Sequence, residues 1–210
     1  MDLDLKNKTV LFLAKRNSGK SVMMRYLLEK HENTYDKVFC ICPTETINRF
    51  YSRLIPENCI MDAWSEHWVA SLIKTLTEYK AKNNREMNVL LILDDCISDV
   101  RFHNSKAFSQ LFSRGRHLFC SVWISSQHLY AIPPLARNNT DYVFSGMLSN
   151  KSKNMLCDEF AGSIDKEDFF ELYDRATKDY SFLIINNNSV KDSKDLNSIY
   201  AIFRTPVWFV

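Results

Sequence analysis

The most constraining part of this sequence is the segment 14–21, which reads Ala-Lys-Arg-Asn-Ser-Gly-Lys-Ser. It follows a short apolar run, Thr9–Leu13, and leads into a stretch with helical periodicity, about Lys20–Lys30. A strand, a loop ending in Gly-Lys-Ser and a helix form the phosphate-binding loop known as Walker A, although that loop usually starts with glycine rather than Ala14. The backbone N–H groups of such a loop and the positive end of the helix dipole bind a polyanion. The segment therefore predicts a nucleotide-binding α/β fold.

The residue types in this loop match the chemistry of bound ATP with Mg²⁺. Gly19 has no Cβ and lets the backbone approach a phosphate. Lys20 is expected to reach the β and γ phosphates, and the Ser21 hydroxyl is expected to bind Mg²⁺. We expect the loop to tolerate the methyl group of Ala14 as long as its φ stays negative. The predicted nucleotide-binding residues are Ala14, Lys15, Arg16, Asn17, Ser18, Gly19, Lys20 and Ser21. Lys15 and Arg16 fit a solvated loop tip equally well.

Two carboxylates close the apolar run Val89–Leu93, which is typical of a strand buried on both faces of a parallel sheet. Asp94, the first of them, is predicted to hold the Mg²⁺ ion through water. Asp95, the second, is predicted to polarise the attacking water as a general base. An acidic strand end occurs in many proteins, so the indication of hydrolysis comes from its combination with the upstream loop.

Polar residues also follow the next apolar run, Phe119–Ile124. In a doubly wound sheet such residues lie at the carboxyl edge, beside the ligand. Gln127 is therefore predicted to sense the γ-phosphate or to orient the attacking water, with help from Ser125 and Ser126. An amide that simply faces the loop is the alternative.

Arginines near this run are candidates for a charge supplied across a subunit interface. Arg114 and Arg116 lie in a bent, exposed turn around a glycine, and Arg137 follows a Pro-Pro bend. A ring ATPase uses such an arginine to stabilise charge on the transferring phosphoryl group, an effect typically worth about 10³–10⁵ in rate. A surface salt bridge is the alternative for each. The predicted catalytic residues are Lys20, Asp95, Gln127, Arg114, Arg116 and Arg137, and the predicted metal-binding residues are Ser21 and Asp94.

Apolar runs of strand type alternate with amphipathic stretches along the chain. The expected strands are Thr9–Leu13, Val38–Cys42, Cys59–Met61, Val89–Leu93, Phe119–Ile124, Tyr142–Phe144, Ser181–Ile185 and Ile199–Phe203. The expected helices are about Lys20–Lys30, Asn48–Leu54, Trp64–Lys82, Phe108–Phe112, Lys151–Phe160 and Lys166–Arg175. This order predicts one domain, 1–210, with a three-layer α/β/α fold. Its sheet is expected to be mostly parallel, with a C-terminal antiparallel hairpin around the polar turn 186–195.

Composition restricts the class of protein. The formal net charge of +2 neither requires nor excludes a nucleic-acid partner, because a local stripe can be basic in a nearly neutral chain. The acidic N-terminal residues and the lack of a long apolar run argue against a signal peptide and against a membrane-spanning segment. The cysteines lie mainly in apolar runs and form no CxxC pair, so reduced thiols and a cytosol-like compartment are expected.

The order of these motifs resembles that of the FtsK/HerA superfamily of ring translocases, and within it the poxvirus-type viral genome-packaging ATPases. The resemblance covers roughly Thr9–Phe144 and rests on AKRNSGKS, VLLILDDC, a helix ending in FSRGRHL, the SSQ strand end and IPPLARNNTDYVF. It implies a RecA/FtsK-like P-loop NTPase that uses ATP to move double-stranded DNA into a preformed capsid. It further implies a homo-oligomeric ring, a hexamer or pentamer, docked on capsid or portal-vertex proteins. Such a motor works in the host cytosol or a viral factory, or is associated with the virion.

Two other functions remain open from the sequence. A small P-loop nucleotide kinase shares the loop but needs an acceptor site and an arginine-bearing lid. The helices at 151–175 contain a single arginine, Arg175. An NTP-gated assembly protein that binds nucleotide but barely hydrolyses it is the second. The basic residues that either line a DNA pore or are merely solvated are Lys80, Lys82, Arg85, Lys151 and Lys153. The apolar end Pro206–Val210 is either a packed strand or a subunit contact.

Overall fold

The computed structural model describes residues 3–83, 85–96, 104–190 and 195–206. Its centre is a sheet with the strand order β3-β2-β4-β5-β1-β6-β7-β8. The strands are β1 Thr9–Leu13, β2 Lys37–Ile41, β3 Ile60–Met61, β4 Val89–Asp94, β5 Cys120–Ser126, β6 Tyr142–Ser145, β7 Ser181–Asn186 and β8 Tyr200–Arg204. In this order the strands from β3 across to β6 pair in parallel, whereas β7 is antiparallel to β6 and β8 is antiparallel to β7. The predicted parallel sheet with a C-terminal antiparallel hairpin is confirmed.

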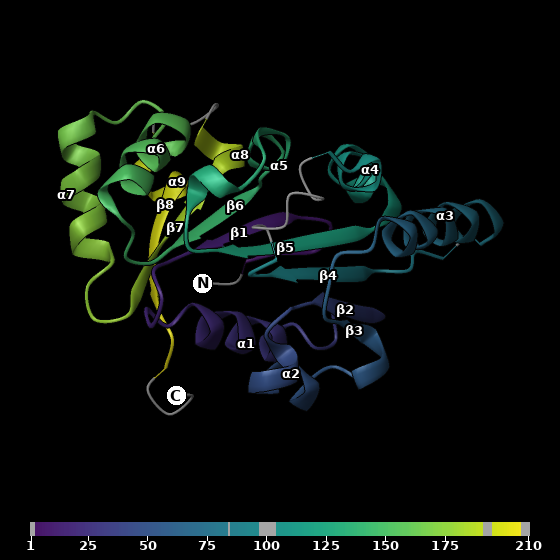
Figure 1. Cartoon of the computed structure of the whole chain (residues 1–210). Coiled ribbons are helices and arrows are strands. Elements are labelled where there is room, and N and C mark those ends of the chain that lie inside the picture. The colour runs from purple at the N-terminus through teal and green to yellow at the C-terminus, as the bar shows by residue number, and fades with distance from the viewer. Residues whose placement is uncertain (1–2, 84, 97–103, 191–194, 207–210) are drawn as a thin grey trace.

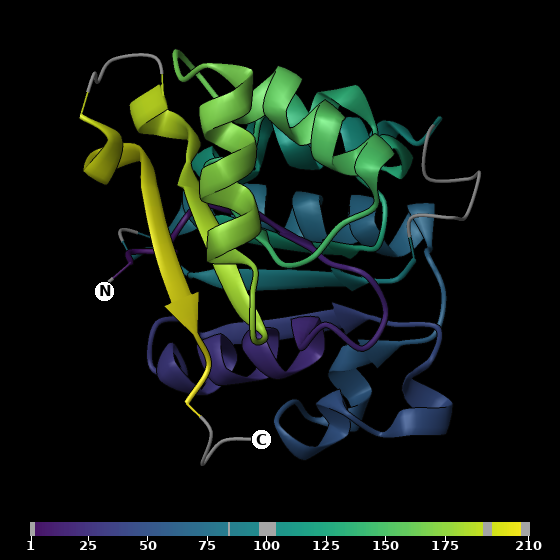
Figure 2. The ribbon, with the colours of Figure 1, turned by 90° about the vertical axis from the view of Figure 1, so that its left-hand side faces the viewer.

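Helices cover both faces of this sheet, as Figures 1 and 2 show. One face carries α1 Lys20–Lys30 and α2 Glu45–Asn48. The other carries α3 Glu66–Lys82, α4 Lys106–Arg114, α5 Pro134–Asn138, α6 Asn150–Phe160 and α7 Lys166–Ala176. Single 3₁₀ turns are η1 Tyr51–Arg53, η2 Glu57–Cys59, η4 Gly115–Leu118 and η5 Leu129–Ala131. The three-layer arrangement expected from the sequence is therefore present.

The central strand β1 is apolar from Val10 to Leu13, where it lies between two helical layers. Val10 and Phe12 pack on one side of the sheet with the buried face of α1. Leu11 and Leu13 point to the other side, into a core shared by α3, α4, α6 and α7. Successive side chains of a strand point to opposite faces, so a strand between two helical layers needs apolar residues at every position. This burial fixes the end of β1, where the candidate loop begins.

The helix expected over Asn48–Leu54 is wrong, because the chain turns after α2. Arg49 takes a left-handed conformation (φ 44°), and only the 3₁₀ turn η1 follows. The buried carboxylate of Glu45 accepts hydrogen bonds of 2.7 to 3.1 Å from successive backbone N–H groups, those of Phe50, Tyr51 and Ser52. These bonds replace the ones that a continuous helix would have supplied to those N–H groups.

In the residues that the structure describes, the chain between β7 and β8 has more structure than the expected turn. Helix α8 Asn187–Val190 follows β7 directly, and helix α9 Leu196–Ile199 leads into β8. Asp195 begins α9 by accepting the N–H of Asn197 at 3.0 Å, as N-cap aspartates do. Residues 191–194 lie outside the described residues, as do 207–210 in the apolar end whose role the sequence left open.

All six cysteines are free thiols, and each of them except Cys59 is buried. Burial raises the pKa of the Cys42 thiol to about 11, so this cysteine stays protonated near neutral pH and packs as a small apolar side chain. In the ranges that the structure describes, no helix combines the length and the apolar character needed to cross a bilayer.

Candidate nucleotide-binding site

The candidate loop leaves the central strand β1 and enters α1. β1 lies between β5 and β6, and the backbone bonding continues into the loop on both sides. The N–H of Ala14 donates to the Ser126 carbonyl at 3.3 Å, and the N–H of Lys15 donates to the Met147 carbonyl at 2.8 Å. The start of the loop is therefore fixed at the carboxyl edge of the sheet, where ligands bind in folds of this type.

The loop then turns through left-handed residues. Asn17 has φ 60° and Gly19 has φ 80°, and Gly19 is the N-cap of α1. Loops that mix right- and left-handed residues can direct successive N–H groups toward one anion. Ala14 keeps a negative φ, which is the condition that we set for tolerating its methyl group.

Asp94 ends β4 in a buried position and is hydrogen-bonded on one side only. Its Oδ2 atom accepts the Tyr51 hydroxyl at 3.0 Å and the Cys42 thiol at 3.9 Å. Its Oδ1 atom is buried and has no hydrogen-bond partner among the described residues. The same holds for the hydroxyl of Ser125, which pairs with Asp94 across the β4–β5 ladder.

This pair of buried oxygen atoms fits a divalent cation. Burial raises the pKa of Asp94, because a carboxylate loses its hydration when it enters the protein interior. A buried oxygen without a partner is costly, and Mg²⁺ binds carboxylate, hydroxyl and water oxygens. Asp94 therefore offers the kind of ligand that the sequence analysis assigned to it. Ser125 was expected only to assist Gln127, and its position next to Asp94 comes from strand register.

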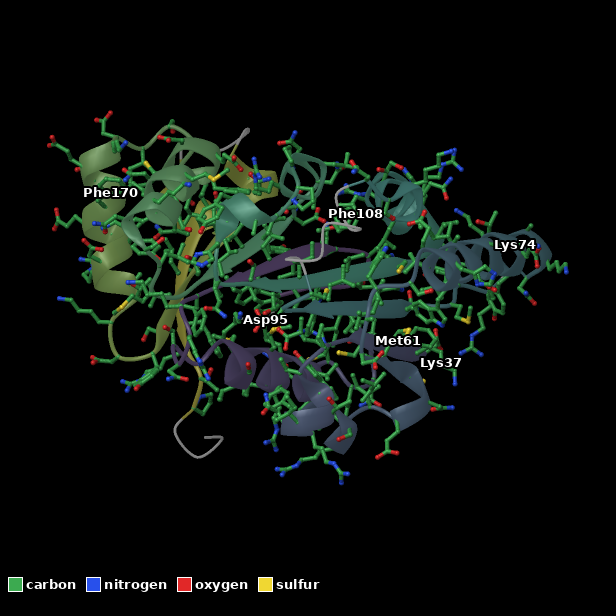
Figure 3. All side chains as sticks on the ribbon, viewed as in Figure 1. Lys37, Met61, Lys74, Asp95, Phe108 and Phe170 are labelled. Carbon is green, nitrogen blue, oxygen red and sulfur yellow. The ribbon has the colours of Figure 1, made fainter. Side chains whose placement is uncertain are left out.

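Lys20 and Asp95 form an ion pair at the site, with Nζ and Oδ1 3.2 Å apart. The lysine side chain is 8% exposed, so it depends on this partner, whereas the aspartate side chain is 38% exposed. Asp95 has φ 49°, a left-handed conformation directly after β4, which takes its carboxylate out of the strand alternation. Figure 3 shows Asp95 near the middle of the molecule, between the sheet and α1. The residues predicted to bind phosphate and to act as base thus contact each other.

These groups surround a cavity of about 370 Å³, a volume typical of small-molecule sites. Its lining residues are Lys15, Arg16, Asn17, Ser18, Gly19, Lys20, Ser21, Val22, Asn48, Asp95 and Gln127. The structure therefore brings the loop, Asp95 and Gln127 together from three separate parts of the chain. Asn48 was missed by the sequence analysis, because no local motif marks it and the turn after α2 brings it to the cavity.

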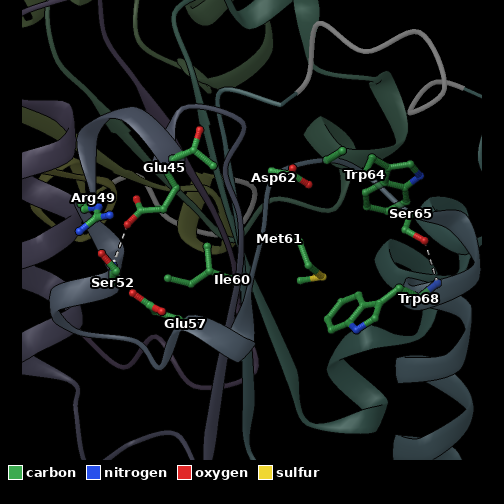
Figure 4. A pocket seen from close by; sticks show the side chains of 12 residues that line it. Glu45, Arg49, Ser52, Glu57, Ile60, Met61, Asp62, Trp64, Ser65 and Trp68 are labelled. Carbon is green, nitrogen blue, oxygen red and sulfur yellow. Dashed lines mark hydrogen bonds between the residues drawn. The ribbon is translucent and has the colours of Figure 1, made fainter.

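A larger cavity of about 800 Å³ lies beside the edge strand β3 (Figure 4). It is lined by Glu45, Thr46, Arg49, Ser52, Glu57, Ile60, Met61, Asp62, Ala63, Trp64, Ser65 and Trp68. Its buried carboxylate, Glu45, already accepts hydrogen bonds from the backbone around η1. This lining contains no residue of the phosphate-binding loop. The smaller cavity is therefore the candidate nucleotide site.

The match to known proteins extends over nearly the whole chain. The family model described as "Poxvirus A32 protein" matches residues 2–202. The chain belongs to this family. Among curated relatives, the "Uncharacterized protein 075L" of Invertebrate iridescent virus 6 is 30% identical over 194 residues, which are 91% of this chain and 75% of the relative.

Solved structures share the fold of this A32 family member. The genome packaging NTPase B204 from Sulfolobus turreted icosahedral virus 2, in complex with AMPPCP, has a TM-score of 0.67 at 15% identity. That match covers 96% of this chain and 99% of B204. The pCW3 conjugation coupling protein TcpA, with ATPgS, has a TM-score of 0.56 at 14% identity and covers 74% of this chain and 53% of TcpA. The P-loop NTPase fold expected from the sequence is confirmed.

In this A32 family member the candidate arginines lie away from the chain's own loop. Arg114 ends α4 and Arg116 lies in η4, both before the amino end of β5, whereas the loop is at the carboxyl edge. Arg116 pairs with the buried Asp141 at 3.5 Å, and Arg137 pairs with Glu159 at 2.8 Å. The lining of the candidate cavity includes none of the three. The structure therefore does not place them in a site formed by one chain.

Several of the lysines considered for a DNA pore have partners within the chain. The Nζ atom of Lys80 donates to a backbone carbonyl of η4 at 2.6 Å. Lys153 pairs with Asp174 at 2.6 Å, and Lys151 lies 4.3 Å from the centre of the Tyr130 ring. These contacts explain the positions of the three side chains without a nucleic acid.

Proposed function

We propose that this chain is an ATP-hydrolysing motor domain, 1–210, that packages viral double-stranded DNA into a preformed capsid. The observation that carries the proposal is the cavity in which the phosphate-binding loop, Asp95 and Gln127 meet. Membership of the A32 family and the likeness to a genome packaging NTPase support the packaging role. The same fold in a conjugation coupling protein is in keeping with a motor of this kind.

Binding of the triphosphate changes the partner of Lys20. The loop N–H groups hold the phosphates, and Ser21 and Asp94 would hold Mg²⁺, which neutralises charge on the β and γ phosphates when bound. Phosphate oxygens then compete with Asp95 for the Lys20 ammonium, whose Nζ atom lies 3.2 Å from the Asp95 carboxylate. Substrate binding therefore releases Asp95 for its role as a base.

Hydrolysis is assigned to Asp95 and Gln127, which line the same cavity as the loop. Gln127 orients a water molecule through its side-chain amide, and Asp95 accepts a proton from that water. The water oxygen bonds to the γ-phosphorus while the bond to the bridging oxygen of the β-phosphate breaks, and ADP and phosphate leave. Both side chains line the same cavity as the loop, which supports water rather than a bound nucleoside as the acceptor.

Arg114 is the best candidate for a charge that acts on a neighbouring subunit. Its side chain is exposed at the end of α4, and it forms no ion pair within the described residues. Arg137 is only 12% exposed and donates to both Glu159 and the Ile132 carbonyl. Arg116 is tied to Asp141. Because the edge that carries Arg114 is opposite the loop, this arginine can serve a nucleotide only in a second copy of the chain.

The remaining parts of the proposal come from the resemblance and from family membership. The chain assembles into a homo-oligomeric ring, a hexamer or pentamer, around double-stranded DNA. The ring docks on capsid or portal-vertex proteins and works in the host cytosol or a viral factory, or remains with the virion. A modest net charge of +2 on each chain is compatible with DNA binding by a ring, because the copies together multiply a small basic surface.

The deciding experiment measures ATP hydrolysis with and without double-stranded DNA. Wild type is compared with Lys20→Ala, Asp95→Asn and the matched control Asp158→Asn, an aspartate that is 68% exposed and lies on α6. We expect stimulation by DNA in wild type and in the control. Loss of the base is expected to lower the rate by about 10²–10⁴, and loss of Lys20 to remove nucleotide binding.

Two outcomes would overturn the proposal. Hydrolysis that is unchanged in Lys20→Ala shows that the loop is not the site. Phosphorylation of an added nucleoside, without stimulation by DNA, shows a nucleotide kinase instead of a motor.

A further inference from the structure

A second cavity adjoins the phosphate-binding loop on its opposite side. It has a volume of about 380 Å³ and shares residues 15–18 with the first cavity. Its other walls come from Met147, which follows β6, and from the segment 177–181, which runs from the end of α7 into the start of β7. The first cavity adjoins the ends of β4 and β5, and β1 separates those strands from β6 and β7. A ligand whose phosphates lie in the loop can therefore extend into this second cavity.

The walls of the second cavity are attached to the loop. The Met147 carbonyl accepts the N–H of Lys15 at 2.8 Å. The preceding carbonyl, that of Gly146, accepts a hydrogen bond from the hydroxyl of Tyr173 on α7. One turn later, the Thr177 hydroxyl donates to the Tyr173 carbonyl at 2.9 Å. These bonds fix the end of β6 and the end of α7 relative to the phosphates.

Tyr180 is the large side chain on this wall. It is 67% exposed, and its ring lies against the loop, because a Cβ atom at Gly19 would be 3.7 Å from the Tyr180 Cδ1 atom. Figure 2 shows the connection between α7 and β7 reaching the start of α1. An aromatic ring therefore stands exposed beside the residue that caps the phosphate-binding helix.

The backbone does not favour a tyrosine at this position. Asp179 has φ 52° and Tyr180 has φ 59°, and the N–H of Ser181 donates to the Lys178 carbonyl at 2.9 Å. This is the φ pattern of a type I′ turn, whose two central positions prefer Asn, Asp and Gly. A bulky residue with positive φ is an outlier that needs an explanation outside the turn itself. The ring beside the loop supplies one.

We propose that the second cavity is a subsite for the base of the bound nucleotide, and that the base stacks on the Tyr180 ring. The inference rests on the proposed function, since the loop must first hold the phosphates. Every nucleobase has a π face, so stacking on an aromatic side chain is favourable whichever base the nucleotide carries. The Asp179 carboxylate and the Ser181 hydroxyl lie in the same wall and can accept hydrogen bonds from amino groups of the base.

The test compares affinities for ATP and for inorganic tripolyphosphate, which has the phosphates but no base. Calorimetric titrations use wild type, Tyr180→Gly and Tyr180→Phe, with Tyr130→Ala as the control for loss of an exposed ring outside both cavities. We expect Tyr180→Gly to bind ATP roughly 5- to 100-fold more weakly. Its affinity for tripolyphosphate is expected to stay within about 2-fold of wild type, since the loop is intact. The phenylalanine and control variants are expected to bind both ligands like wild type.

Glycine suits the turn better than tyrosine, so Tyr180→Gly is expected to unfold at a temperature no lower than wild type. Weaker ATP binding in this variant then reports the lost ring rather than a damaged fold. Equal ATP affinity in wild type and Tyr180→Gly overturns the subsite and leaves the proposed hydrolysis untouched. Equal weakening of ATP and tripolyphosphate also overturns it, because the effect then belongs to the loop. A wild-type protein that binds neither ligand refutes the proposed function itself and, with it, the subsite.

Discussion

The methyl group of Ala14 occupies space that a side chain at Gly146 would need, since a Cβ atom at 146 would lie 3.1 Å from it. The same Cβ atom would lie 3.0 Å from the ring of Phe182 on β7. The alanine that departs from the usual start of the phosphate-binding loop is thus matched by the glycine directly after the neighbouring strand β6. The two positions are complementary in size, which explains how the loop accommodates the extra methyl group.

Gly146→Ala is expected to destabilise the protein by about 1–3 kcal/mol, because the added methyl overpacks a buried contact. Ala14→Gly removes the partner methyl, so the double variant is expected to recover part of the loss. Urea unfolding of the wild type, the two single variants and the double variant gives the coupling between the sites. Strictly additive effects would show that the two positions do not share this space.

Asp94 makes the stability of the nucleotide-free protein depend on pH. Burial raises its pKa above the ordinary value of 3.8, so the folded state holds this proton more tightly than the unfolded state. The contribution of Asp94 to the free energy of unfolding is therefore largest below pH 3.8. It is lost as the pH rises through the raised pKa of the folded state. Asp94→Asn removes the titration and is expected to be at least as stable as wild type at neutral pH.

The measurement is the free energy of unfolding at acidic and at neutral pH for both proteins, without nucleotide. Addition of ATP and Mg²⁺ is expected to stabilise wild type and to have a smaller effect on Asp94→Asn, because the amide is a poorer ligand for the ion. An Asn variant that is less stable than wild type at neutral pH would contradict a carboxylate whose pKa is raised by burial.

The parts of the site that follow from sequence are those encoded by neighbouring residues. The loop between β1 and α1 and the acids after β4 each lie within one short segment, so apolar periodicity and residue type were sufficient to find them. Gln127 could be placed because strand ends in a parallel sheet meet at one edge. Ser125 and Tyr51 could not, since their contacts with Asp94 depend on strand register and on the packing of η1 under the sheet.

Two errors of the fold prediction have a common cause. The chain breaks after α2 because the Glu45 carboxylate captures three backbone N–H groups, and a helical pattern does not reveal such a side-chain bond. The polar residues directly after β7 form the short helix α8, Asn187–Val190, because contacts with distant parts of the chain, and not their polar composition, decide their conformation. The N–H of Asn187, for example, donates to the Asp141 carbonyl, far away in the sequence, at 2.9 Å.

Tyr51 is expected to tune the metal site through Asp94. Its buried hydroxyl donates to Asp94 Oδ2 at 3.0 Å and fixes the carboxylate so that Oδ1 remains available. Tyr51→Phe is expected to weaken the binding of Mg²⁺ about 10- to 100-fold, as is typical for partners of metal ligands. The Mg²⁺ concentration that gives half of the maximal hydrolysis rate is expected to rise by the same factor. A titration of the ATPase rate with Mg²⁺ measures the effect.

Tyr35→Phe is the matched control, because the Tyr35 hydroxyl is also buried but donates to the Leu5 carbonyl at 3.0 Å, away from the site. Both variants lose one buried hydrogen bond, which costs about 1 kcal/mol of stability in each case. If the two variants show the same Mg²⁺ dependence, the hydroxyl of Tyr51 has only a structural role.

Arg114 gives a test of the shared site that does not require knowledge of the ring size. Arg114→Ala is expected to lower the ATPase rate by about 10³–10⁵ if the arginine acts on a neighbouring subunit. Lys20→Ala is inactive for a different reason, because its own loop cannot hold the phosphates. In a mixture of the two variants, some interfaces combine an intact loop with an intact arginine, so part of the activity is expected to return.

Arg137→Ala is the comparison. The Arg137 guanidinium donates to Glu159 at 2.8 Å and to the Ile132 carbonyl at 2.5 Å, so its loss is expected to lower stability first. A mixture of Arg114→Ala and Lys20→Ala that stays inactive, while each protein remains folded and oligomeric, would rule out Arg114 as the residue that completes the neighbour's site.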